Sequence, residues 1–129
     1  LIVVRLLNLI QDVTKGQLDA SEISRLSRLT AEKEKECQIV KTEVTIIWGD
    51  YFKEPQISEY PNIHDLTHSI MRCASNCKQD VNLSNGEELL ALVNQFADIF
   101  WQSKGYSTEL LAAPYPPSLG VVKPVLEHV

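Results

Sequence analysis

The most regular pattern in the chain is a row of apolar and small residues between Asp19 and Phe52. Its members recur every three or four positions, a spacing that places side chains on one face of an α-helix. Only Lys33 interrupts the row, whose members are Ile23, Leu26, Thr30, Cys37, Val40, Val44, Ile47 and Tyr51. The pattern predicts one long helix. Other segments must cover its apolar face, because such a helix is not stable alone.

The middle of this stretch, Thr30 to Glu36, is strongly charged and allows two interpretations. Thr30 could cap a second helix, which would divide the stretch after Leu29. Alternatively, the charged section is a solvated part of one continuous helix. The apolar residues keep the same phase on both sides, which a loop would normally disrupt. The sequence therefore favours one helix, which starts at Asp19 as its cap and ends before Pro55.

Three further helices are predicted from apolar periodicity and end signals. Residues Leu1 to Lys15 form a mostly apolar segment that stops at Gly16. This first helix is buried at the centre of the bundle, or one of its flanks meets a missing part of the parent protein. Asn62 caps a helix that ends near Gln79, and its buried face is predicted to contain Ile63, Leu66, Ile70, Cys73 and Cys77.

The last predicted helix starts at a capping box, Ser84 to Glu87, and stops at Lys104-Gly105. Ser107 to Ala113 is interpreted as a short helix, and Gly120 to Val129 as an extended tail. The predicted fold is all-α: a four-helix, mostly antiparallel bundle with one long helix and an extended, proline-containing C-terminal tail. Residues 1–105 would form the bundle. Residues 106–129 would pack on it or lead to a further element.

Composition and charge limit the classes of partner that this protein is expected to bind. The chain has 129 residues and a net charge of −5, without a cluster of Lys and Arg. Nucleic acid and anionic membranes are therefore disfavoured as partners. The three cysteines are expected to be reduced thiols of an intracellular protein, cytoplasmic or nuclear. Because the chain begins with Leu1, we expect it to be a fragment, a trimmed chain or a mature product.

Two pairs of residues have the one-turn spacing of metal ligands: His64 with His68, and Cys73 with Cys77. On a helix, Cys73 and Cys77 lie about 180° and 220° from His64, so the two pairs face opposite sides. We therefore expect core thiols and solvated histidines, and no metal site. His64-Asp65 also resembles a ligand pair of metal-dependent phosphohydrolases, but the other histidine, His128, is near the chain end.

No catalytic constellation is recognisable in the sequence. A nucleophilic serine or cysteine needs a base held beside it, and neither a G-x-S-x-G motif nor a phosphate-binding glycine loop is present. The carboxylates lie mainly on predicted solvated faces, so no tuned acid–base pair is indicated. The sequence analysis therefore predicts a protein that is not an enzyme and has no cofactor.

Aromatic residues gather near the ends of predicted helices. They form part of the core, or they line a hydrophobic groove for a partner helix or peptide. The Pro114 to Pro117 segment has the spacing of a polyproline ligand. The predicted partner-binding residues are Trp48, Tyr51, Phe52, Trp101, Tyr115 and Pro116.

The predicted function is a non-enzymatic protein–protein interaction module, a scaffold or adaptor within a larger intracellular assembly, with a protein partner or through self-association. The alternative is a bundle that binds a small apolar ligand or lipid between its first, second and fourth helices. A metal-dependent hydrolase is a third, less favoured hypothesis.

Overall fold

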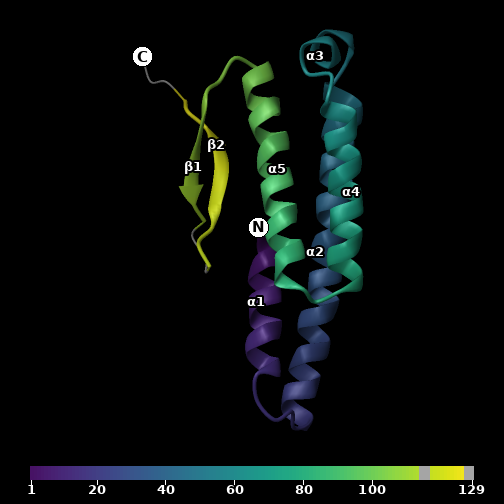
Figure 1. Cartoon of the computed structure of the whole chain (residues 1–129), viewed down its shortest axis with the longest axis vertical. Helices are drawn as coiled ribbons and strands as arrows, with labels where there is room; N and C mark the ends of the chain where they lie inside the picture. Colours follow the sequence, from purple (N-terminus) through teal and green to yellow (C-terminus); the bar gives the residue numbers. More distant parts are fainter. Residues whose placement is uncertain (114–116, 127–129) are drawn as a thin grey trace.

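The computed structural model describes residues 1–113 and 117–126, which form five α-helices and one two-stranded sheet (Figure 1). The longest helix, α2, runs the length of the molecule. One half of it lies beside α1, and the other half lies beside α4 and α5. The elements are α1 (Ile2–Thr14), α2 (Ala20–Tyr51), α3 (Glu54–Glu59), α4 (Ile63–Gln79), α5 (Leu83–Ser103), β1 (Thr108–Ala112) and β2 (Gly120–Pro124).

The prediction of one continuous long helix is confirmed. Helix α2 contains 32 residues without a break, so the alternative division after Leu29 does not occur. The Asp19 side chain caps the helix by accepting a hydrogen bond of 2.8 Å from the backbone N–H of Glu22. At the other end, Phe52 takes an extended backbone conformation. The last helical residue, Tyr51, therefore lies four positions before Pro55.

Lys33 corrects the expectation of a fully solvated middle section. Its side chain is only 1% exposed, because it lies in phase with the apolar row. The Nζ atom donates hydrogen bonds of 3.1 Å and 2.6 Å to the backbone carbonyls of Lys78 and Asp80. Carbonyls at a helix C-terminus have no partner within the helix. Lys33 therefore joins the middle of α2 to the end of α4.

The core lies between the helices, on the faces that the periodicity predicted. The predicted face of α4 is buried throughout, and α1 is buried on most sides, as its composition indicated. Helix α1 also approaches the first turn of α5 closely, where a β-carbon at Gly86 would lie 2.6 Å from Leu7 Cδ1. Central core residues are Val3, Leu7, Cys37, Val44, Phe52, Ile63, Ile70, Ala74, Leu89 and Phe96.

The all-α prediction is wrong in the C-terminal segment, where Ser107 to Ala113 was expected to be helical. Strands β1 and β2 form an antiparallel hairpin in which Leu110 pairs with Val122. A two-stranded hairpin is marginal by itself, but this one packs on α5. The division of the chain into residues 1–105 and 106–129 stays a prediction.

Two side chains of α5 hold the hairpin. The amide of Asn94 donates to the Gly120 carbonyl at 2.8 Å and accepts from the Val122 N–H at 2.9 Å. The Thr108 hydroxyl is hydrogen-bonded to the Asp98 carboxylate. These contacts depend on residues distant in the sequence, which explains why local patterns did not reveal the strands.

One predicted helix start and one predicted capping hydrogen bond need correction. Helix α5 begins at Leu83, before the predicted capping box at Ser84, because Asn82 Oδ1 accepts from the Ser84 N–H at 3.0 Å. At α4, Asn62 occupies the cap position, but its side chain makes no capping hydrogen bond. The predicted stop at Gly105 is confirmed by its positive φ of 88°, which glycine adopts without strain.

Replacing Lys33 with methionine would keep most of its volume and remove both hydrogen bonds to the end of α4. We expect Lys33→Met to lower the free energy of unfolding by about 1–3 kcal/mol, the usual cost of buried polar groups left without a partner. Urea unfolding of Lys35→Met, at an exposed position of the same charged section, is the matched control. Equal stability of the two variants would contradict the assigned role of Lys33.

Replacing Asn94 with alanine would remove both side-chain hydrogen bonds to β2. We expect about fivefold faster hydrogen–deuterium exchange at the Val122 amide, since the loss of its hydrogen bond changes stability by about 1 kcal/mol. Amides of α2 and α4 should be unaffected. The exposed neighbour Gln95→Ala is the control, and unchanged exchange at Val122 in Asn94→Ala would argue against this attachment.

Candidate functional site

An apolar groove lies between α2 and α5. It encloses about 350 Å³, and Glu43 is the one charged residue among those that line it. The other lining residues are Ile39, Val40, Val44, Ile47, Val93, Phe96, Ala97, Phe100 and Trp101. A groove between two helices has a shape that accepts a further helix or another elongated apolar group.

The structure brings three of the predicted partner-binding residues into one aromatic cluster at the C-terminal ends of α2 and α5. The Tyr51 ring lies 5.2 Å from Phe52 and 5.0 Å from Phe100, measured between ring centroids. Trp101 contacts Phe100 at 5.1 Å and also lines the groove. Lys104 Nζ lies 4.8 Å from the centre of the Phe100 ring, which is a favourable cation–π contact.

The remaining predicted partner-binding residues lie elsewhere. Trp48 Nε1 donates a hydrogen bond of 3.0 Å to His64 Nδ1 on α4. Tyr115 and Pro116 lie outside the described residues. Phe52, a member of the aromatic cluster described above, is only 5% exposed and is part of the core. Partner binding by these six residues stays a prediction.

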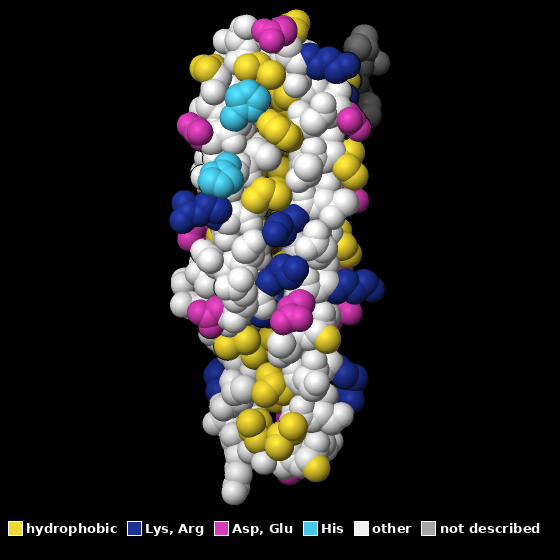
Figure 2. Space-filling model, turned by 90° about the vertical axis from the view of Figure 1, so that its right-hand side faces the viewer, with side chains coloured by type: hydrophobic (Ala, Val, Ile, Leu, Met, Phe, Trp, Pro, Cys, Tyr) yellow, Lys and Arg dark blue, Asp and Glu magenta, His cyan; other side chains and the backbone are white. Residues whose placement is uncertain are grey.

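The histidines of α4 lie on its outer face, as the helix geometry indicated. His64 and His68 are exposed, and Figure 2 shows both histidine side chains on the molecular surface. The cysteines of the same helix are buried on its opposite side. The structure therefore separates the two pairs, and His128 lies outside the described residues.

The three cysteines meet in the core, which the sequence analysis did not anticipate. A hydrogen bond from the Cys77 thiol to Cys37 lowers the pKa of Cys37, and the same bond together with burial raises the pKa of Cys77. Burial raises the pKa of Cys73, whose Sγ donates to the Asn85 carbonyl at 3.4 Å. The available signal was the position of Cys37, in phase with the buried row of α2.

The described residues contain no ready metal site. Within residues 1–113 and 117–126, no group of three or more His, Cys, Asp or Glu side chains is placed to hold a metal ion. The buried thiols and the exposed histidines of α4 cannot converge, because the helix itself lies between them.

In the face shown in Figure 2, basic and acidic side chains are interspersed over α4 and α2. Among the described residues, no helix combines the length and apolar character needed to cross a bilayer.

Comparison with known proteins identifies similar sequences. The chain is 32% identical to the nickel superoxide dismutase of Streptomyces coelicolor over 78 residues, which are 60% of this chain and 60% of that protein. It is 31% identical to the nickel superoxide dismutase of Streptomyces seoulensis over 77 residues, 60% of this chain and 59% of that one. The matches thus span about three fifths of the length of these curated relatives.

Solved structures of nickel superoxide dismutases are also similar to this chain. The structure of native nickel superoxide dismutase is 28% identical and has a TM-score of 0.68, over 81% of this chain and 86% of that chain. The apo structure of nickel superoxide dismutase gives the same identity and TM-score, over 81% of this chain and 91% of that chain. The helical bundle is therefore shared with these proteins.

The family assignment corrects the predicted function. A family model for nickel-containing superoxide dismutases matches residues 1–104, which include all five helices. This match overturns the prediction of a non-enzymatic scaffold, and with it the lipid-binding alternative. The absence of a catalytic constellation was misleading, because a reaction performed at a bound metal does not need one in the helical body. The chain belongs to the nickel-containing superoxide dismutase family.

Proposed function

We propose that the natural protein carrying this sequence is a nickel-dependent superoxide dismutase and that the described residues form its helical body. The observation that carries the proposal is the family match over all five helices. Superoxide dismutation oxidises one superoxide anion to dioxygen and reduces a second, with two protons, to hydrogen peroxide. Nickel, when bound, supplies the redox chemistry.

The described residues do not fit a nickel site. Imidazole nitrogen is a suitable donor for nickel, and thiolate sulfur is a ligand of several other transition metals. However, the described imidazoles are on the outer face of α4, while the thiols are free and buried in the core. We therefore infer that the nickel ligands lie outside the described residues, and we assign the helical body a supporting role.

We also propose that the protein self-associates through the α2–α5 groove, with a second copy as its occupant. The apolar lining supports this proposal, and so does the exposed surface beside it. Ile39 and Ile46, two turns apart on α2, are 41% and 51% exposed. A symmetric pair of chains would cover both grooves at once, because a twofold contact uses the same patch on each copy.

The proposed activity can be tested on the natural protein, purified with and without added nickel. We expect superoxide removal only in the nickel-containing preparation, and its loss when a chelator removes the metal. Metal analysis should accompany the activity assay. A folded preparation that contains nickel and does not remove superoxide would contradict the proposed function.

The same preparation tests the inferred location of the ligands. His64→Ala and His68→Ala, separately and together, should leave the nickel content unchanged because both side chains lie on the outer face of α4. Loss of nickel in either variant would show that the helical body does supply a ligand.

Self-association can be tested by placing a charge in the groove. We expect Ala97→Glu to reduce the mass measured by light scattering to that of one chain, since an unpaired buried carboxylate is costly. Gln95→Glu, on the exposed face of the same helix, should leave the assembly intact. A wild-type protein that is already a monomer would refute the proposal.

A further inference from the structure

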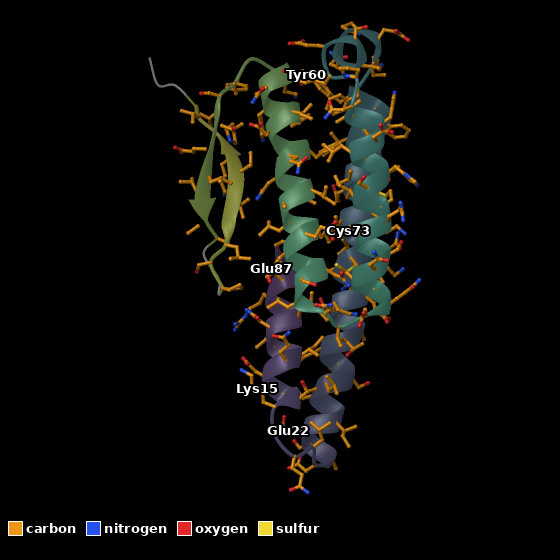
Figure 3. The ribbon with its side chains drawn as sticks, in the orientation of Figure 1. Lys15, Glu22, Tyr60, Cys73 and Glu87 are labelled. Atoms are coloured by element: carbon orange, nitrogen blue, oxygen red, sulfur yellow. The ribbon has the colours of Figure 1, made fainter. Side chains whose placement is uncertain are left out.

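One hydrogen bond at the protein surface joins the C-terminal end of α2 to the start of α4. Trp48 Nε1 donates to His64 Nδ1 at 3.0 Å. The planes of the two rings are inclined at 84° and their centroids are 5.7 Å apart, so the rings meet edge-on and do not stack. This contact lies at the end of the bundle where Figure 3 labels Tyr60, which precedes His64 by four residues. The proposed function does not use this contact.

The direction of this hydrogen bond fixes the protonation state of His64. An indole nitrogen only donates, so the imidazole Nδ1 must present a lone pair to Trp48. A neutral imidazole that accepts at Nδ1 carries its single proton on Nε2. An imidazolium carries a proton on both nitrogens and accepts at neither. Protonation of His64 and its hydrogen bond to Trp48 therefore exclude each other.

The position of His64 within α4 adds a second unfavourable effect of protonation. Helix α4 starts at Ile63, so His64 lies in the first turn, where the free backbone N–H groups make the helix end partly positive. Asn62 makes no capping hydrogen bond at this end. A positive imidazole adds like charge there. Asp65 in the same turn offsets part of this charge, but it does not replace the acceptor that Trp48 loses.

No other titratable group competes for His64 among the described residues. Within residues 1–113 and 117–126, its imidazole forms no ion pair and no second side-chain hydrogen bond. Lys41 lies two turns before Trp48 in the same phase of α2, and its Nζ donates to Ser75 Oγ at 3.0 Å. The phenols of Tyr51 and Tyr60 are neutral between pH 5 and pH 8. The remaining charged side chains of the neighbouring elements are exposed: Asp50, Lys53, Glu54, Glu59, Asp65, His68 and Arg72.

The packing around the contact determines what its loss would change. Trp48 is partly buried and packs against the core. The start of α4 is also held by Ile63 and Leu66, which are 0% and 7% exposed. These apolar contacts do not depend on pH. Loss of the hydrogen bond therefore loosens the first turn of α4 and leaves the bundle folded.

We propose that Trp48 and His64 form a proton-sensitive contact, which holds the start of α4 against the end of α2 while His64 is neutral and is lost when His64 is protonated. Imidazole side chains change charge between pH 5 and pH 8. The contact is therefore present at pH 8 and absent at pH 5, and its contribution to stability is lost as the pH falls. Neither nickel nor superoxide takes part, so this inference can fail separately from the proposed enzymatic activity.

The test follows the indole N–H signals of the full chain by NMR from pH 8 to pH 5. The chain contains two tryptophans, and Trp101→Phe identifies which signal belongs to Trp48. We expect the Trp48 signal to move upfield in one titration as its hydrogen bond is lost. The Trp101 signal should stay in place, because that ring contacts Phe100 and Tyr106. Nitrogen NMR of His64 at pH 8 should show a proton on Nε2 and none on Nδ1.

Two matched variants separate His64 from the other described histidine. His64→Gln removes the titrating group, so its Trp48 signal should not depend on pH. His68→Gln, at an exposed position one turn further along α4, should leave the titration of the Trp48 signal unchanged. Circular dichroism of each variant checks that it is folded.

Backbone hydrogen–deuterium exchange measures the loosening of α4. The Leu66 and Ile23 amides occupy equivalent first-turn positions and donate to the Asn62 and Asp19 carbonyls at 3.0 Å and 2.9 Å. We expect the exchange rate of Leu66 relative to Ile23 to rise about two- to fivefold from pH 8 to pH 5, as for the loss of one hydrogen bond. In His64→Gln this ratio should stay constant.

Four results would overturn the proposal. The first is a Trp48 signal that does not change with pH in the wild type, and the second is a titration that persists in His64→Gln. The third is a neutral His64 with its proton on Nδ1. The fourth is a constant ratio of Leu66 to Ile23 exchange in the wild type, because the contact would then not hold the start of α4.

Discussion

The covering of one face of α2 by three other helices is the constraint on which the structure depends. A helix of 32 residues is about 48 Å long at 1.5 Å per residue, longer than its neighbours. No single helix of the described chain covers it. Helix α1 packs on its N-terminal half and α4 packs on its C-terminal half (Figure 1), while α5 reaches the C-terminal end of α2 through the ring contact between Phe100 and Tyr51. The apolar phase must therefore continue across the point where the covering helices change.

Lys33 lies on this same apolar face of α2, and its environment shows how the face accommodates the end of a covering helix. The end of α4 leaves backbone carbonyls without helical partners, and a buried ammonium satisfies two of them. A leucine at this position would fill space but leave both carbonyls unpaired. The residue that breaks the hydrophobic pattern is thus the one that fits the end of a neighbouring helix.

The helices could be predicted from the sequence because their signals are local. Asp19 with Glu22 and the three–four spacing through Cys37 and Val44 are all readable within a few turns. The hairpin could not be predicted in this way, because Asn94 in α5 satisfies the backbone of a strand 26 residues later. The meeting of Cys37 with Cys77 was hidden for the same reason, since it depends on how α2 and α4 pack.

Function was beyond reach from residue chemistry for a different physical reason. Residue chemistry points to a metal site only where several ligands converge, and no group of three or more His, Cys, Asp or Glu side chains does so within the described residues. In a metal-dependent enzyme, however, a helical body can be necessary without contributing a ligand. The family similarity extends over residues 1–104 as a whole, and no short motif carries it. A convergent site can establish an activity, whereas its absence from one part of a protein establishes nothing about the rest.

Two side chains of one stretch of α2 hold the end of α4 in register. Lys33 Nζ donates to the Lys78 carbonyl at 3.1 Å, and Gln38 Oε1 accepts from Lys78 Nζ at 3.2 Å. The first contact is made by a side chain that is 1% exposed, whereas the second lies at the surface. Because a hydrogen bond in a buried site is the more costly one to leave unmade, Lys33 rather than Gln38 determines where α4 can end along α2.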